Sequence, residues 1–365
     1  MNILVLAGGL SPERDVSLSS GSLIANALAS RGDAVLLADL YTGCDIPEGA
    51  DPLSLFSSDV RYKAAVPESA PDLEALRAEY ESVNRGSLFG RNILKLCHAA
   101  DRVFIALHGA CGENGQLQAA LDMHGISYTG SGYLGAALAM DKDIAKRIAA
   151  ADGIPTALSL KITRDTEPET ILSEVGLPCV IKPCAGGSSV GVSIVRCEQE
   201  LSAALDTAFA YEDSLLAERF VAGREFSLGV LDCKGLPRDV TPDMSLCTRE
   251  GDLLALPAIE IIPRCGFYDY RNKYQSGLTE EITPADLTPE QSRRIQRLAL
   301  TAHRSLRLGG YSRSDFILDE VTGDFVWLEA NTLPGMTPTS LLPQEAAAAG
   351  ISYGSLCETI VSGER

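Results

Sequence analysis

The chain has 365 residues, of which 45% are hydrophobic, so it is long enough for two or three domains with cores of their own. Its formal net charge of -18 argues against nucleic acid or an anionic membrane surface as a partner, because both require a basic surface. No apolar run is long enough to cross a membrane, and the apolar start has no basic flank typical of a signal peptide. We therefore expect a cytoplasmic, enzyme-sized protein without nucleic-acid or membrane partners.

The N-terminal part alternates between expected strands and helices. Residues 3–7 are a continuous apolar run, residues 17–28 carry apolar side chains at helical spacing, and residues 35–40 are a second apolar run. This order predicts a right-handed βαβ unit. Glu13 follows the first strand, where open α/β sheets bind ligands, although an ordinary solvated loop explains its position equally well.

Residues 44–94 differ in character, with several prolines among acidic and small polar residues, and we interpret them as an insertion with one amphipathic helix at 73–80. An apolar run at 103–107 then predicts another buried strand, and residues 116–123 predict a helix. Between them, His108 begins a glycine-rich loop in which backbone can approach a ligand. His108 itself is as consistent with a structural imidazole as with a functional one.

Residues 136–151 predict one long helix, in which Lys142 and Lys146 lie one turn apart and are expected to form a solvated face. A strand at 179–182 and its return at 192–195 enclose a Gly/Ser turn at 185–191. Small residues with free N–H groups are typical of a nest around phosphate oxygens. The turn is not a Walker loop, because the lysine precedes the glycines. A flexible β-turn is the alternative.

Residues 215–230 predict two strands around a short glycine turn. Glu218 and Glu225 flank an apolar run there that could hold an adenine, and surface acids are the alternative. Further on, residues 267–274 form an aromatic and cationic loop, and residues 289–308 predict a helix.

The C-terminal region predicts a hairpin, with strands at 316–318 and 325–328 and a turn that contains Gly323. Such a hairpin would bring Asp315 level with Glu329 and Asn331, which share a face because they are two residues apart. Three oxygen ligands beside Arg313 suit a magnesium ion that carries nucleotide phosphates. The alternative is a hairpin with ordinary solvated acids, and the Pro-Gly-Met-Thr loop that follows favours the metal site.

Seven motifs occur in an order that resembles the D-alanine:D-alanine ligases of the ATP-grasp superfamily. They are Gly8-Gly-Leu-Ser-Pro-Glu13-Arg-Asp-Val-Ser17, His108-Gly with Gly-Glu113-Asn-Gly, Tyr128-Thr-Gly-Ser-Gly, Met140-Asp-Lys142, Lys182-Pro with Gly-Ser188-Ser-Val-Gly, Lys273-Tyr274, and Leu328-Glu-Ala-Asn-Thr with Pro-Gly-Met-Thr. The resemblance extends from the first strand to about Pro343 and is interrupted by the 44–94 insertion. Asn114 departs from it, because the family usually has Asp there.

The resemblance implies an α/β fold with the three-domain ATP-grasp architecture. It implies a Rossmann-like N-terminal domain at 1–129 that carries the 44–94 insertion, a central lid domain at 130–218, and a C-terminal domain at 219–365 with the metal hairpin and a substrate loop. ATP would be gripped between the last two domains.

The resemblance also implies roles for individual residues. Lys142, Lys182, Ser189, Glu218, Glu225 and Lys273 would bind ATP, with the lysines on the phosphates and the glutamates on adenine and ribose. Asp315, Glu329 and Asn331 would bind two Mg2+, with Mn2+ as an alternative. Glu13, Ser188, Tyr274 and Arg313 would be catalytic. Glu13, His108, Gly335 and Ser340 would bind the amino-acid substrates.

The implied activity is ATP-dependent ligation of two D-alanines through an acyl phosphate, for peptidoglycan precursor synthesis, by a homodimer. Tyr274 after Lys273 favours D-alanine as the second substrate. The alternatives are a D-alanyl-D-serine ligase or another ATP-grasp carboxylate-amine ligase. A non-catalytic nucleotide-binding protein is the least favoured interpretation.

Overall fold

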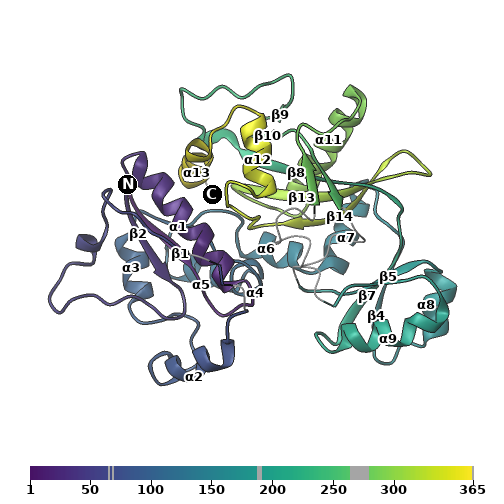
Figure 1. The fold of residues 1–365 in the computed structure, drawn as a ribbon, viewed down its shortest axis with the longest axis horizontal. Coiled ribbons are helices and arrows are strands. Elements are labelled where there is room, and N and C mark those ends of the chain that lie inside the picture. The colour runs from purple at the N-terminus through teal and green to yellow at the C-terminus, as the bar shows by residue number, and fades with distance from the viewer. Residues whose placement is uncertain (65, 68–69, 187–190, 264–278, 364–365) are drawn as a thin grey trace.

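The computed structural model describes residues 1–64, 66–67, 70–186, 191–263 and 279–363. The described elements form three units, each with a sheet of its own. In Figure 1 the N-terminal unit lies at the left, a small unit lies at the lower right, and the largest sheet lies between and above them. The fold is therefore of the predicted α/β class.

The N-terminal unit is a parallel sheet in the order β2-β1-β3, flanked by helices. The central strand β1 is buried except at its first residue, which explains its unbroken apolar sequence. The predicted βαβ unit is confirmed. Its elements are β1 (Asn2–Ala7), α1 (Arg14–Ser30), β2 (Ala34–Asp39), η1 (Pro52–Leu55), α2 (Leu73–Asn84), α3 (Ile93–Ala99), β3 (Arg102–Ile105), α4 (Ala110–Glu113) and α5 (Gln116–Met123).

The helix predicted in the 44–94 region is present as α2 and is longer than expected. It begins after Asp72, whose side chain accepts a hydrogen bond from the Ala75 amide at 2.9 Å. Asn84 at its end is buried and donates to the Tyr41 carbonyl at 2.8 Å. This contact ties the end of α2 to the N-terminal sheet.

The single helix predicted at 136–151 is wrong, because two helices are present, α6 (Tyr133–Met140) and α7 (Lys142–Ala151). Asp141 lies between them in an extended conformation, and its side chain caps α7 by accepting from the Ile144 amide at 3.0 Å. The Lys142 amide donates to the Cys184 carbonyl at 2.9 Å instead of continuing α6. The break thus fixes Lys142 beside the turn that follows β5.

The small unit is an antiparallel sheet in the order β4-β7-β5-β6, with two helices on one side. Strands at both predicted positions, 179–182 and 192–195, are present. Its elements are β4 (Ser159–Thr163), α8 (Pro168–Glu174), β5 (Cys179–Pro183), β6 (Ser193–Val195), α9 (Glu198–Phe209) and β7 (Ser214–Arg219).

The largest unit contains a sheet that has seven strands in the described part of the chain. The two strands predicted at 215–230 are present as β7 and β8, but they belong to different sheets, so the chain passes from the small unit to the large one between them. The large unit comprises β8 (Gly223–Asp232), η2 (Cys233–Gly235), β9 (Thr248–Glu250), β10 (Leu253–Ala255), β11 (Ile259–Pro263), β12 (Thr279–Ile282), α11 (Pro289–Ser305), β13 (Tyr311–Asp319), β14 (Phe325–Asn331), α12 (Leu341–Ala348) and α13 (Tyr353–Ser362).

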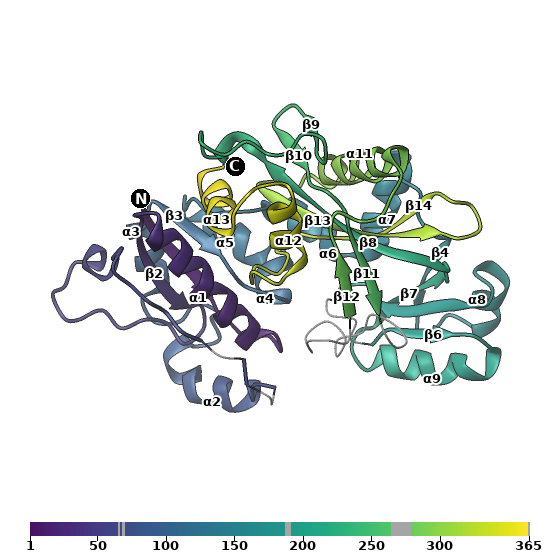
Figure 2. The ribbon, with the colours of Figure 1, turned by 45° about the horizontal axis from the view of Figure 1, so that its top comes forward.

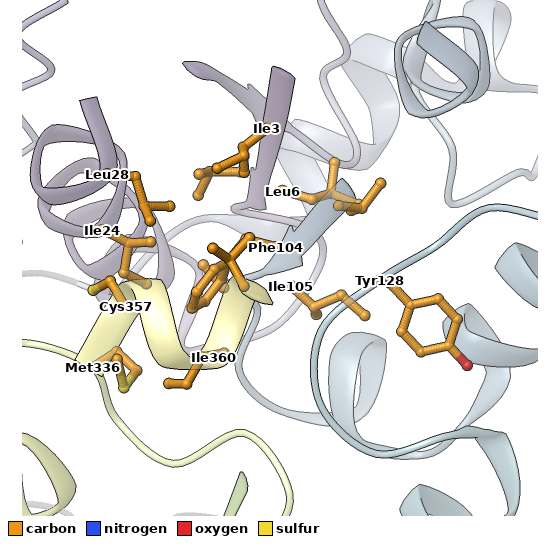
Figure 3. Close-up of a cluster of buried hydrophobic side chains, with 14 of the residues drawn as sticks. Ile3, Leu6, Ile24, Leu28, Phe104, Ile105, Tyr128, Met336, Cys357 and Ile360 are labelled. Carbon is orange, nitrogen blue, oxygen red and sulfur yellow. The ribbon is translucent and has the colours of Figure 1, made fainter. Parts of the chain in front are cut away.

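The C-terminal helix α13 joins the large unit to the N-terminal one. Figure 3 shows Cys357 and Ile360 of α13 among Ile24 of α1 and Phe104 of β3, and all four belong to one buried cluster. Burial of these side chains stabilises the contact by about 25 cal/mol for each Å² of apolar surface removed from water. This packing holds the C-terminal end of the chain against the N-terminal sheet and α1.

Candidate active site

The floor of the site is the hairpin of β13 and β14, which has the predicted register. Asp315 pairs with Glu329, and Arg313 pairs with Asn331. Residues opposite one another in an antiparallel pair share a face. Two carboxylates, one amide and one guanidinium therefore lie together on one face of the large sheet, as predicted.

The Asp315 carboxylate accepts hydrogen bonds from the side chains of Ser227, Arg313 and Asn331. The Ser227 hydroxyl donates to Oδ1 at 2.6 Å, and the Asn331 amide donates to Oδ2 at 3.0 Å. Arg313 binds both oxygens, with Nε 3.0 Å from Oδ1 and Nη2 2.9 Å from Oδ2. Such a bidentate pair fixes the position of both side chains.

A pocket opens above the second strand of the hairpin, and its lining includes Lys142, Glu329 and Asn331. Lys142 Nζ lies 3.3 Å from Glu329 Oε2 and donates to the Gly186 carbonyl at 2.6 Å. The pocket thus places a cation from the start of α7 against a carboxylate from the hairpin.

The hairpin has the donors that a magnesium ion requires, namely the two carboxylates of Asp315 and Glu329 and the amide oxygen of Asn331. In the described residues, no group of three or more His, Cys, Asp or Glu side chains is arranged to hold a metal by itself. This suits Mg2+, which is commonly bound by one or two carboxylates together with substrate phosphates. Lys142 and Arg313 neutralise the two carboxylates in this structure.

Glu113 lines the same pocket, although its sequence motif did not single it out as a site residue. Burial raises the pKa of its carboxyl to about 8, with smaller contributions from Glu13 and Glu329. Glu113 is therefore largely protonated at pH 7. The signal in the sequence was its place in the Gly-Glu-Asn-Gly loop after β3, where α/β sheets bind ligands.

A second group of charges lies between the small and large units. Glu218 of β7 contacts two lysines, Lys182 of β5, whose Nζ is 2.5 Å from Oε2, and Lys146 of α7 at Oε1. Burial opposes ionisation of Glu218, but the two ammonium groups lower the pKa of its carboxyl below the ordinary value. Lys182 and Glu218, both predicted as nucleotide-binding residues, are thus brought together.

The solvated face predicted for Lys142 and Lys146 is wrong. The side chains are 12% and 2% exposed, and each is paired with a glutamate from another element. Burial lowers the pKa of Lys146, an effect that Glu218 opposes. Spacing on a helix reports which residues share a face, but it does not report what covers that face.

The residues predicted to bind the amino acids lie in the loops after β1, β3 and β14. His108 is 8% exposed, and burial lowers the pKa of its imidazole, while Glu13 and a hydrogen bond from the ring to the Leu333 backbone act in the opposite direction. Gly109 has a φ of +76°, and a Cβ there would lie 3.0 Å from Glu13 Oε2. Glycine is needed both for this backbone conformation and for the close approach of Glu13.

Gly335 and Ser340 lie in the loop between β14 and α12. The Ser340 hydroxyl lies 3.1 Å from the Thr337 amide and 2.8 Å from the Thr337 hydroxyl. A Cβ on Gly335 would come within 2.9 Å of the Ser340 hydroxyl oxygen. The Pro-Gly-Met-Thr sequence therefore closes a compact turn just before α12.

Glu225 of β8 lies two residues before Ser227, whose side chain contacts Asp315, so the two share a sheet face with the hairpin residues. Four predicted residues, Ser188, Ser189, Lys273 and Tyr274, lie outside the described residues.

Comparison with known proteins decides the family. Residues 2–131 match the profile of the D-ala D-ala ligase N-terminus, and residues 149–362 match that of the D-ala D-ala ligase C-terminus. The chain belongs to the D-alanine:D-alanine ligase family. A D-alanine:D-alanine ligase of Pediococcus pentosaceus is 42% identical and covers 100% of this chain and 98% of its own. One of Lacticaseibacillus casei is 40% identical, with 100% and 96% covered.

Solved structures of the ligase family have the same fold. The D-alanine:D-alanine ligase from Bacillus anthracis complexed with ATP is 28% identical, has a TM-score of 0.71, and covers 100% of this chain and 96% of its own. The VanG D-Ala:D-Ser ligase from Enterococcus faecalis is 26% identical, with a TM-score of 0.72 and coverage of 99% and 98%. The three-domain ATP-grasp class expected from the sequence is confirmed.

Glu345 is a further buried acid in this ligase-family chain. It lies on α12 with 0% exposure, and its Oε2 accepts from the Gly229 amide at 2.6 Å. Strands β10 and β11 both pair with β8, but residues 256–258 between them belong to neither strand. The Gly229 amide of β8 faces this break, so the Glu345 side chain serves as its acceptor in place of a strand carbonyl. Burial raises the pKa of Glu345 well above its ordinary value, which nearby Arg313 opposes.

We expect Glu345→Gln to become more stable relative to wild type as pH rises. A carboxyl with a raised native pKa binds its proton more tightly in the folded state, so the wild type loses stability as pH increases above the unfolded pKa of about 4.3. Glutamine keeps an acceptor for the Gly229 amide and does not ionise. The gain in Tm between pH 5 and pH 8 should be about 1 °C or more, the effect of roughly 1 kcal/mol in a chain of 365 residues, because the unfolding entropy is about 2.1 cal/mol/K per residue.

The measurement is thermal unfolding of both proteins across this pH range. Glu79→Gln on the exposed face of α2 is the matched control, and it should show no such trend. A constant difference in Tm between wild type and Glu345→Gln would show that Glu345 is ionised when folded.

Proposed function

We propose that the chain is an ATP-dependent ligase that joins two D-alanines to D-alanyl-D-alanine for peptidoglycan precursor synthesis. The observation that carries this proposal is the convergence of the hairpin face, the Lys142 pocket and Glu13 around Glu113, whose carboxyl lines the pocket and interacts with Glu13, Glu329, Arg313 and Lys142. Family membership supports it over the full chain. The sequence has kept Lys182, Arg313 and the carboxylates of Asp315 and Glu329, which argues against a non-catalytic nucleotide-binding protein.

The domain boundaries that we propose are those expected from the sequence, 1–129, 130–218 and 219–365. ATP would bind between the second and third of these. Lys142 and Lys182 would contact its phosphates, and Glu218 and Glu225 its adenine and ribose. Ser189 and Lys273 would complete the phosphate contacts. The contacts of Lys142 and Lys182 with carboxylates of the site support these roles.

Asp315, Glu329 and Asn331 would hold Mg2+, either as two ions or replaced by Mn2+, and the ions would neutralise charge on the phosphoryl group during transfer. Among the chain's own groups, Arg313 is fixed by Asp315 with its guanidinium on the same sheet face. That placement suits stabilisation of negative charge as it develops on the phosphoryl group and the acyl oxygen.

The two amino acids would bind between the loops after β3 and β14. Glu13 would hold the ammonium of the first D-alanine, and Ser340 the carboxylate of the second, with His108 nearby. Ser188 and Tyr274 would close over both substrates. The Gly335 amide is a further donor for the oxyanion of the tetrahedral intermediate.

The chemistry follows from the weak reactivity of a carboxylate. Transfer of the γ-phosphoryl group to the first D-alanine would make an acyl phosphate and release ADP. The neutral amine of the second D-alanine would then attack the acyl carbon, and phosphate would leave. Water also destroys an acyl phosphate, so the site must exclude it before transfer. Exclusion of water also strengthens each charge contact, from about 1 kcal/mol in water to about 4 at an effective dielectric of 20.

A D-alanyl-D-serine ligase is the second candidate, because the VanG D-Ala:D-Ser ligase has a fold as similar as that of the B. anthracis enzyme. We favour D-alanine because the sequence has Tyr274 after Lys273.

Phosphate release with ATP, Mg2+ and each of D-alanine, D-serine and D-lactate tests the proposal. We expect kcat/KM for D-alanine as second substrate to exceed that for either competitor by about tenfold or more, because one added or exchanged polar group in a matched pocket changes binding by 1–3 kcal/mol. A higher value for D-serine or D-lactate would reassign the second substrate. ATP binding without D-alanine-dependent turnover would indicate a different carboxylate-amine ligase.

We propose that the enzyme works as a homodimer in the cytoplasm, where ATP is available, and size-exclusion chromatography with light scattering tests the oligomeric state. Of the helices that the structure describes, none combines the length and apolar character needed to cross a bilayer.

A further inference from the structure

Among the cations of the site that the structure describes, Lys146 is the most deeply buried, and the sequence predicted only a solvated position for it. Its side chain is 2% exposed, and its Nζ contacts Glu218 Oε1. The same Nζ lies 3.3 Å from the Trp327 carbonyl and 5.9 Å from the centre of the Trp327 ring. Trp327 is two residues before Glu329 on β14, and α7 lies beside β14 in both views (Figures 1 and 2).

Lys146 and Lys182 both contact the Glu218 carboxylate, but the side chain of Lys146 is restrained by more contacts than that of Lys182. Lys182 is 11% exposed at its side chain and is the second-last residue of β5, which precedes the Gly/Ser turn. Lys146 is held by a second polar partner and by the face of a fully buried indole. If one lysine leaves Glu218 to reach a ligand, the geometry selects Lys182.

We propose that Lys146 is a positioning residue for the nucleotide site, a fixed counter-ion that keeps Glu218 neutralised while Lys182 turns from Glu218 to the phosphates of ATP. This inference rests on the proposed function. Its physical basis is that a buried carboxylate left without a cation is strongly unfavourable. When Lys146 neutralises Glu218, Lys182 can move from Glu218 to the phosphates. Without Lys146, Glu218 retains Lys182, and the phosphates lose the contact with that cation.

The test is Lys146→Met, measured by calorimetric titration with ATP in the presence of Mg2+ and by competition with adenosine. We expect the Kd for ATP to rise by about tenfold or more, equivalent to about 1.4 kcal/mol. The Kd for adenosine should stay within about twofold, because adenosine has no phosphate to draw Lys182 away. Lys161→Met, an exposed lysine of β4, is the control and should leave both unchanged.

A general disruption of the adenine pocket would weaken ATP and adenosine by the same factor, and that result would overturn the inference. Equal ATP affinity in wild type and Lys146→Met would overturn it too. A wild-type chain that does not bind ATP would instead refute the proposed function, which separates the two failures.

A second comparison remains decisive even if Lys146→Met alone does not fold. In a Glu218→Gln background no buried carboxylate needs a counter-ion, so adding Lys146→Met should change the Kd for ATP by less than about twofold. Such non-additivity is expected only for residues that act through one another. A further tenfold loss of affinity in the double variant would show that Lys146 acts independently of Glu218 and would refute the proposal.

Discussion

Glu329→Gln should lower kcat by about a thousandfold or more while the protein remains folded. Glu329 lies on the pocket wall opposite Asp315, and its Oε2 is 3.3 Å from Lys142 Nζ. Glutamine has nearly the same shape but no charge, so it would hold a divalent ion and balance Lys142 poorly. Loss of several kcal/mol of transition-state stabilisation corresponds to this factor, at about 1.4 kcal/mol for each tenfold.

The measurement is steady-state phosphate release at saturating ATP and D-alanine, with circular dichroism and Tm to verify folding. Glu320→Gln is the matched control, because Glu320 is an exposed acid in the turn of the same hairpin. We expect wild-type kcat there. A Glu329→Gln variant with kcat close to wild type would remove Glu329 from the proposed metal site.

Arg313→Lys should also lower kcat by about a thousandfold, with a much smaller change in the Kd for ATP. Lysine keeps the positive charge but cannot form the two parallel bonds that Arg313 makes to Asp315 at 3.0 and 2.9 Å. The cation would then be misplaced relative to the phosphoryl group. Removing an arginine from phosphoryl transfer costs factors of about 10³ to 10⁵ in kcat.

A contact between α11 and the turn of the hairpin provides the control for this substitution. Arg294 makes a similar two-bond contact with Asp324, at 3.3 and 3.1 Å, where both side chains are nearly half exposed. Arg294→Lys should therefore leave kcat within about twofold of wild type. If both variants lost activity equally, the effect of Arg313→Lys would be ascribed to destabilisation of the hairpin, and Tm measurements would reveal it.

Short-range patterns predicted the hairpin correctly. The spacing of Asp315, Glu329 and Asn331 around a glycine turn defined the register, because residues joined by one turn can pair in few ways. The parallel pairing of β1 with β2 in the predicted βαβ unit followed from the same kind of local information.

Patterns on a single helix were less informative. Residues 136–151 have good helix formers throughout, yet the chain breaks at Asp141 because the Lys142 amide bonds to Cys184, far along the sequence. Helical spacing put Lys142 and Lys146 on one face, but the glutamates that bury them come from β7 and β14.

The sequence by itself determined the family, the α/β class, the order of the motifs and the register of the C-terminal hairpin. Each of these depends on neighbouring residues or on motifs that keep their order along the chain. Only the tertiary structure decided that β7 and β8 belong to different sheets, that Glu113 lines the pocket, that Glu345 is a buried acid, and that Lys146 shares Glu218 with Lys182. These features depend on burial and on contacts between distant segments, which local propensity does not encode.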